Sequence, residues 1–122
     1  MKYKSFSLRK RAGSFRFAWE GIRCFFGREH NAWVHLAATI SVFVAAKWFR
    51  ISRTEFLLLI SVTGFVWAAE IFNTAIEKTM DFISPQQRPE IKYIKDLSAA
   101  AVLVASFTAL LAGAFIFIPK IF

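Results

Sequence analysis

The residues of this chain with the clearest chemical potential are acids inside an apolar stretch. The run EIFNTAIEKTMD, residues 70–81, directly follows FLLLISVTGFVWAA and holds three carboxylates and an amide. We take Glu70 as the origin of a helical wheel with about 100° per residue. Asn73, Glu77 and Asp81 then fall at about −60°, −20° and +20°. The four polar side chains therefore share one narrow face of a helix.

A carboxylate within a membrane-spanning helix is costly, and its presence usually marks a function. Glu70 lies about 22 Å along the helix from Glu55, which places it just inside a hydrocarbon core of about 30 Å. A helix end that enters water explains Asp81 well and Glu77 in part, but it explains Glu70 poorly. Such an acid must face protein, water, a cation or a partner. We expect a lipid-facing Glu70 at a site reached from the cytosol and from lipid together, where it accepts a proton from a substrate hydroxyl.

Other polar residues are expected at the same membrane depth. Lys95 and Asp96 precede the last apolar run, where the alternatives are a lysine anchor at the interface and a helix cap. Glu29 lies in the junction FGREHNAW. Glu29 and Glu77 could share Mg²⁺, which accepts one or two carboxylates and takes other ligands from water and phosphates. An acid, a cation and a lysine near the interface favour phosphoryl transfer from a nucleotide to a lipid hydroxyl.

The composition indicates a single membrane domain. The chain has 122 residues, of which 57% are hydrophobic, and its formal net charge is +8. A soluble domain of this length cannot hide so much apolar surface. Basic and apolar character together predict an anionic membrane surface as a partner and argue against nucleic acid. Cys24 is the only cysteine, which excludes an internal disulfide.

The pattern of apolar runs predicts an all-α membrane protein. Its predicted elements within one domain, residues 1–122, are an amphipathic surface helix at 5–28 and three transmembrane helices at 31–49, 54–83 and 95–118. Pro85 and Pro89 should end the second span, and Pro119 should close the third. Neither GxxxxGK nor GxGxxG occurs. A nucleotide site must therefore be built from side chains at the membrane surface.

The first helix and the loops predict the orientation. The apolar stripe of the first helix comprises Phe15, Trp19, Ile22 and Phe26, and its basic stripe comprises Arg9, Arg16 and Arg23. This pattern favours a helix in the membrane surface over an amphipathic helix packed on protein. Twelve of the 16 Lys and Arg residues fall on the side of the N-terminus and the proline-containing loop. These segments and the active site should be cytoplasmic, in a multi-pass protein of the plasma or inner membrane.

The motif Glu70-x-x-Asn73-Thr-Ala-Ile-Glu77-x-x-x-Asp81, followed by Lys95-Asp96-x-x-Ala-Ala-Ala-Val, resembles the signature of the prokaryotic diacylglycerol kinase and undecaprenol kinase family. The likeness extends over nearly the whole chain and includes WEGI before Glu29. It implies a small homotrimeric membrane kinase that uses magnesium and ATP to phosphorylate a lipid alcohol.

The resemblance also implies residue roles. Glu70 is the catalytic base at the lipid substrate, and Asn73 supports it. Glu29 and Glu77 hold the metal and contact ATP. The remaining implied ATP contacts are Lys95, Asp96, Gln86, Gln87, Arg88, Lys10 and Phe17. At Lys10 and Phe17 some members of the family have Arg and Tyr, so the contacts to adenine and phosphate differ in detail.

The sequence leaves alternatives open for the lipid substrate and for the class of protein. REHNAWVHLAA, NTAIE and ISPQQRPEIKYIKD are closer to the undecaprenol-type branch than to the diacylglycerol-type branch. His35 could line the lipid entrance, although an isolated histidine on an apolar face is more often a hydrogen-bonded packing residue. The rival functions are a multipass transporter subunit that uses Glu70 as a proton or cation carrier, and a lipid-binding scaffold without catalysis.

Overall fold

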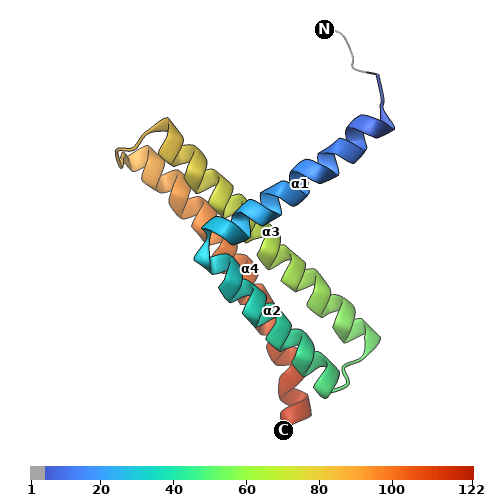
Figure 1. Ribbon diagram of the computed structural model, residues 1–122. Helices are drawn as coiled ribbons and strands as arrows, with labels where there is room; N and C mark the ends of the chain where they lie inside the picture. The colour runs from blue at the N-terminus through green and yellow to red at the C-terminus, as the bar shows by residue number, and fades with distance from the viewer. Residues whose placement is uncertain (1–4) are drawn as a thin grey trace. The chain divides into compact units, whose positions relative to one another are not determined.

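The structure, a computed structural model, describes residues 5–122 and consists of α-helices and their connections. The helices are α1 (Leu8–Arg28), α2 (His30–Trp48), α3 (Arg53–Ile83) and α4 (Pro89–Ile121) (Figure 1). The all-α fold and its four helices are confirmed. The helix α3 ends at Ile83, and α4 begins at Pro89, ahead of residue 95, where the third span is expected to start.

The chain forms two compact units. The first runs to Ala37 and contains α1 and the start of α2, and the second runs from Ala38 to Phe122. In the first unit, Ser7 caps α1, because its Oγ accepts a hydrogen bond from the backbone N–H of Lys10 at 3.4 Å. Phe15 and Trp19 of the apolar stripe are 79% and 61% exposed. The apolar face of α1 is thus open for a membrane surface.

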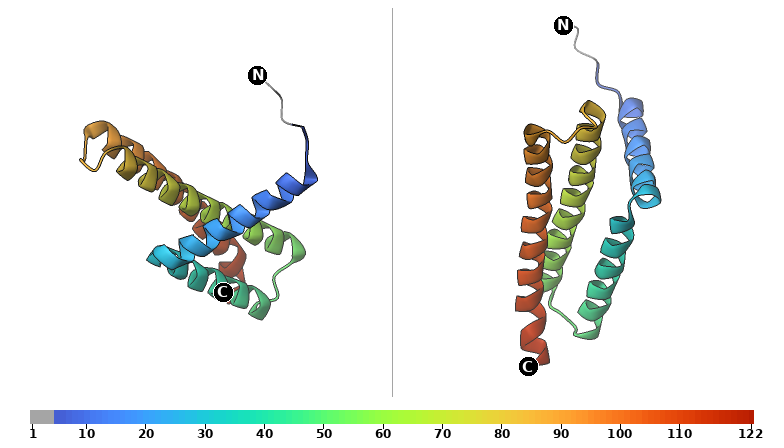
Figure 2. Two further views of the ribbon diagram at one scale, coloured as in Figure 1. Left: turned by 45° about the horizontal axis from the view of Figure 1, so that its top comes forward. Right: turned by 90° about the vertical axis from the view of Figure 1, so that its left-hand side faces the viewer.

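In the second unit, α3 and α4 lie side by side along their length (Figures 1 and 2). A small apolar cluster of Ala46, Leu59 and Ile116 joins the end of α2 to the start of α3 and the end of α4. The ring centroids of Phe43 and Phe56 are 5.7 Å apart in an edge-on contact beside this cluster. The core of the unit therefore lies at one end of the helix pair.

Local chemistry explains the ends of α3. A capping box begins the helix: Ser52 Oγ accepts from the N–H of Glu55 at 3.1 Å, and a carboxylate oxygen of Glu55 accepts from the N–H of Ser52 at 2.9 Å. The helix ends at Ile83, two residues before Pro85.

The two later prolines behave differently. Pro89 occupies the first turn of α4, where the missing N–H costs nothing. The prediction that Pro119 closes the third span is wrong, since α4 continues to Ile121. A proline in the last turn removes a single helical hydrogen bond. The Phe122 N–H still donates to the Ile118 carbonyl at 3.1 Å.

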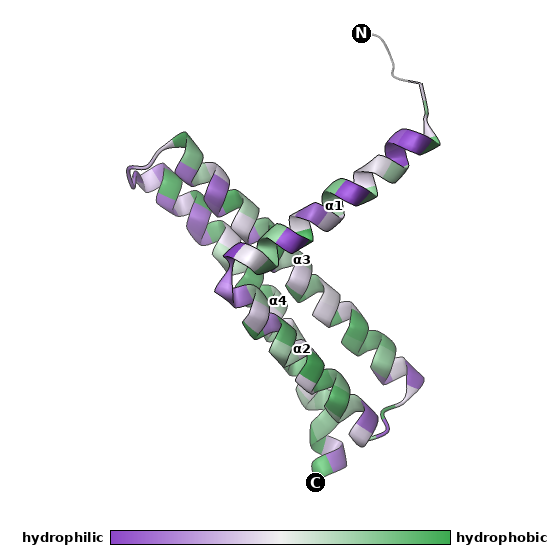
Figure 3. Ribbon diagram, in the orientation of Figure 1, coloured by the Kyte–Doolittle hydropathy of each residue, from purple (hydrophilic) through white to green (hydrophobic). Residues whose placement is uncertain are grey.

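By length and composition, α3 and α4 can each cross a membrane. Figure 3 shows apolar residues along the middle of both helices and polar residues near the connection between them. Only 6% of the most apolar window of α4 is buried within the chain, whereas a core helix of a soluble protein would be mostly buried. Within residues 5–122 these two helices alone meet the criterion, so the span predicted at 31–49 stays a prediction.

Candidate active site at one end of the helix pair

Two polar side chains are buried in the described part of the chain, Glu70 on α3 and Ser98 on α4, at 5% and 6% exposure. The expectation that Glu70 faces lipid is therefore wrong for the single chain. A carboxylate within an apolar span is stabilised by packing against protein, because hydrocarbon offers it no hydrogen-bond partner. Glu70 is thus covered by protein, and a lipid hydroxyl needs an opening to reach it.

Asn73 is held one turn beyond Glu70 by a hydrogen bond between helices. Ser98 Oγ lies 2.7 Å from Asn73 Oδ1 and 2.9 Å from the Lys95 carbonyl. The single hydroxyl proton can be donated to one of these oxygens at a time. Sequence reasoning selected Asn73 but missed Ser98. The available signal was a serine one turn after Lys95 in an otherwise apolar run.

Charged residues of α3 and α4 pair at the same end. Lys95 Nζ donates to Asp81 Oδ1, which links the two helices. Lys92 Nζ donates to Asp96 Oδ2 within α4. The Asp81 and Asp96 side chains are 56% and 62% exposed, and ion pairs of such exposure contribute roughly 0–1 kcal/mol. These pairs can therefore open for a phosphate.

The other predicted residues of the second unit lie around these pairs. Glu77 is half-buried on α3. Gln86 and Gln87 are exposed in the connection between α3 and α4, and Arg88 is the N-cap residue of α4. Ser84 Oγ donates to the Gln86 carbonyl at 3.1 Å, which orders the start of the connection. We call the end of the helix pair that contains residues 70–98 the hairpin end.

Two predicted ATP contacts, Phe17 and Lys10, lie on α1 of the first unit. Phe17 is 71% exposed on α1. Lys10 lines a surface hollow of about 260 Å³ together with Ser5, Ser7, Arg11 and Ser14. The Arg11 guanidinium lies 4.8 Å from the centre of the Phe6 ring at this hollow. Hydroxyl, amine and guanidinium groups are donors that suit a phosphate, and sequence reasoning named only Lys10 among them.

Glu29 is the C-cap residue of α1, and its N–H donates to the Phe25 carbonyl at 3.0 Å. It lies between two helices, because α1 ends at Arg28 and α2 begins at His30. His35 is half-buried on α2.

Glu29 belongs to the first unit and Glu77 to the second, so their shared metal site stays a prediction. Residues 5–122 contain no group of three or more Asp, Glu, His or Cys side chains that could hold a metal. Mg²⁺ bound with a nucleotide needs only one or two carboxylates, because phosphates and water complete its shell. The half-buried carboxylate of Glu77 fits that requirement.

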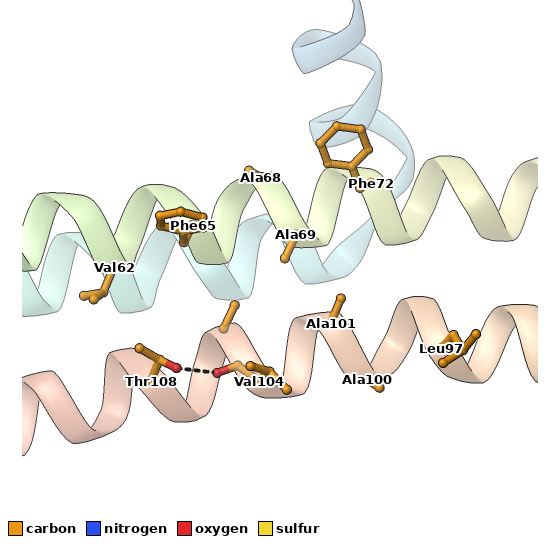
Figure 4. Close-up of a pocket in the computed structure, with 11 residues that line it drawn as sticks. Val62, Phe65, Ala68, Ala69, Phe72, Leu97, Ala100, Ala101, Val104 and Thr108 are labelled. Carbon is orange, nitrogen blue, oxygen red and sulfur yellow. Dashed lines mark hydrogen bonds between the residues drawn. The ribbon is translucent and has the colours of Figure 1, made fainter.

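An apolar groove of about 730 Å³ runs between α3 and α4 (Figure 4). Its α3 side includes Phe65, Ala69 and Phe72, and its α4 side includes Ala101 and Ala105. In Figure 4, Ala69 and Ala101 point towards the facing helix. Small residues at such a site allow another helix to approach closely.

Comparison with known proteins gives a consistent result. Residues 16–117 match the sequence signature of the family described as prokaryotic diacylglycerol kinase. The chain is 33% identical over 106 residues to an undecaprenol kinase of Bacillus subtilis, which covers 87% of this chain and 83% of that protein. It is 30% identical over 109 residues to a diacylglycerol kinase of Synechocystis, covering 88% of this chain and 62% of that protein. A diacylglycerol kinase of Escherichia coli K12 is 30% identical over 102 residues, with 78% of each chain covered.

Proposed function

The chain belongs to the prokaryotic diacylglycerol kinase family, and we propose that it transfers the γ-phosphate of ATP to undecaprenol in preference to diacylglycerol. Membership makes it a lipid kinase and a membrane protein. The preference for undecaprenol is supported by the stretches REHNAWVHLAA and NTAIE and by the undecaprenol kinase of Bacillus subtilis among its relatives.

The observation that carries the proposal is the buried Glu70 one turn from the Asn73–Ser98 hydrogen bond. In the proposed reaction, the lipid hydroxyl oxygen attacks the γ-phosphorus of ATP while its proton passes to Glu70. The bond between the γ-phosphorus and the bridging oxygen breaks, and ADP leaves with that oxygen. The product is a lipid phosphate monoester. Asn73 supports the orientation of Glu70 and of the acceptor.

ATP is proposed to bind at the hairpin end and on α1. Lys95 exchanges its contact with Asp81 for a phosphate oxygen, since the exposed pair contributes little. Further ATP contacts are assigned to Asp96, Gln86, Gln87, Arg88, Lys10 and Phe17. Glu29 and Glu77 would hold Mg²⁺, which would neutralise charge on the phosphates.

Assembly and orientation complete the proposal. The protein is proposed to be a homotrimer, and the alanine-lined groove in Figure 4 supports this because a helix of a second copy can pack closely there. We propose that the N-terminus and the hairpin end lie in the cytoplasm, which the excess of Lys and Arg in these segments supports. An opening for the lipid at Glu70 would then form when copies assemble or when neighbouring segments move.

Membership of a kinase family favours the enzyme over a transporter subunit or a scaffold. In addition, Glu70 and the polar residues bonded near it, Asn73, Ser98, Asp81 and Lys95, lie at one end of the α3–α4 pair, whereas a carrier must present its acid to both sides.

The test measures ADP release by detergent-purified protein with undecaprenol, with diacylglycerol and with neither lipid. We expect lipid-dependent release that is faster with undecaprenol, and a Glu70→Gln variant gives the background. Faster release with diacylglycerol would overturn the proposed lipid preference. Release that no lipid stimulates would contradict kinase activity towards both lipids.

A further inference from the structure

We propose that the chain has a second lipid site, a pocket for the phosphate group of an anionic phospholipid, at the end of the helix pair opposite the hairpin end. The pocket has a volume of about 370 Å³ and lies where α2 passes into α3. Glu55, next to this pocket in the sequence, is roughly 33 Å along α3 from Glu77. The pocket is therefore separate from the proposed kinase site.

Three cationic residues line the pocket. Lys47 comes from the last turn of α2, Arg50 from the connection, and Arg53 from the first position of α3. All three are exposed. The positive end of the α3 helix dipole adds to their field. Such a concentration of positive charge attracts an anion.

The nearest carboxylate does not supply that balance. Glu55 accepts from Lys120 Nζ with both oxygens, at 3.0 and 2.9 Å, and Oε1 also accepts from the Ser52 N–H. The negative charge of Glu55 is thus paired with Lys120 at the end of α4, and the same carboxylate caps the start of α3. Among residues 5–122, the structure has no ion pair for Lys47, Arg50 or Arg53.

The apolar walls favour a lipid over a free anion. Phe43, Ile51 and Phe56 line the same pocket as the three cations. Trp48 beside it is 81% exposed, and tryptophan is enriched at membrane interfaces. A phospholipid satisfies both parts of the pocket, because its phosphate meets the cations while its apolar body contacts the rings. An inorganic phosphate ion would leave the rings in water.

Arg50 has a positive φ of 51°. A non-glycine residue rarely adopts this conformation, which turns the chain sharply between α2 and α3. Arg50 thus lines the pocket at the turn itself, together with Lys47 from α2 and Arg53 from α3.

The experiment uses the full chain in detergent with added phosphatidylglycerol or phosphatidylcholine, and native mass spectrometry counts the lipids retained. The test variant combines K47Q, R50Q and R53Q. The matched control combines R28Q, K78Q and K92Q, which removes the same number of exposed positive charges from other parts of the chain. We expect the native chain to retain phosphatidylglycerol preferentially. Affinity should fall on the order of 100-fold in the test variant and stay near the native value in the control.

Two results would overturn the proposal. An equal loss of affinity for phosphatidylglycerol in the control would mean general attraction of the lipid to a basic protein. Displacement of the lipid by millimolar inorganic phosphate would mean a site for a free anion. If the triple variant does not fold, the single variant R53Q decides the matter. It should weaken retention roughly fivefold, and unchanged retention would contradict the site. The readout is independent of kinase turnover, so its failure is distinguishable from failure of the proposed function.

Discussion

The two ends of the α3–α4 pair join the helices by opposite means. At the hairpin end, the Asn73–Ser98 hydrogen bond lies beside ion pairs whose aspartates are more than half exposed. At the opposite end, Glu55 and Lys120 are 28% and 26% exposed, and the apolar cluster of Ala46, Leu59 and Ile116 lies in the same region. The difference indicates that the Glu55–Lys120 pair stabilises the contact between α3 and α4, whereas the ion pairs of the hairpin end can open for a nucleotide.

The largest expected effect is on the buried acid of the hairpin end. Glu70→Gln keeps the shape of the side chain but removes the proton acceptor. We expect turnover to fall about 100- to 10,000-fold, the usual contribution of a general base, while ATP binding stays near the native level. ADP release and nucleotide binding by calorimetry measure the two quantities. Loss of ATP binding would contradict the base role.

The half-buried acid of the same face should affect the nucleotide. Glu77→Gln removes a carboxylate proposed to hold Mg²⁺ with ATP. We expect the affinity for Mg–ATP to fall on the order of 10- to 100-fold, the range found when a metal site is impaired. Titrating Mg²⁺ at fixed ATP measures this shift. Equal affinity in the variant would remove Glu77 from the metal site.

The hydrogen bond between helices should have a smaller effect. Ser98→Ala removes the donor to Asn73 Oδ1 in a buried position. We expect a loss of about 1–3 kcal/mol in the free energy of unfolding, because the part-buried Asn73 Oδ1 loses its donor. A fall in kcat with little change in the KM for ATP is also expected. Ser61→Ala is the matched control, since exposed Ser61 bonds only to the Leu57 carbonyl of its own helix. Equal effects in both variants would deny Ser98 a positioning role.

Breaking the exposed Asp81–Lys95 ion pair should strengthen the binding of ATP, unlike the three preceding substitutions. Asp81→Asn frees Lys95 from its partner on α3. We expect the KM for ATP to decrease by up to about fivefold, because an exposed pair contributes at most about 1 kcal/mol. The effect should shrink at high salt, which screens exposed charges. An increase in KM would mean that Asp81 itself assists nucleotide binding.

The sequence predicted the helices and their ends best, because apolar runs and prolines act on the local backbone without regard to distant residues. One amphipathic stripe and three long apolar runs predicted four helices, and Pro85 predicted the end of α3. The exposure of Glu70 could not be predicted, because a helical wheel gives the face of a residue but not what covers it. Ser98 escaped notice since serine is common in small-residue helices, and only the partner helix reveals its bond to Asn73. Asp81 likewise gained a role only through the pairing with Lys95.

The smallest effect on activity is expected from the end opposite the hairpin. Lys120→Gln removes the cation that contacts both oxygens of Glu55, while the capping box between Ser52 and Glu55 stays in place. The variant should melt at a lower temperature than the native protein, with unchanged kcat and KM at a temperature where both are folded. Lys92→Gln is an informative comparison, because its pair with Asp96 is exposed and lies within α4, so it contributes less to joining the helices. Should Lys120→Gln lower kcat without affecting melting, the two ends are coupled, and the division between a stabilising end and a reactive end is wrong.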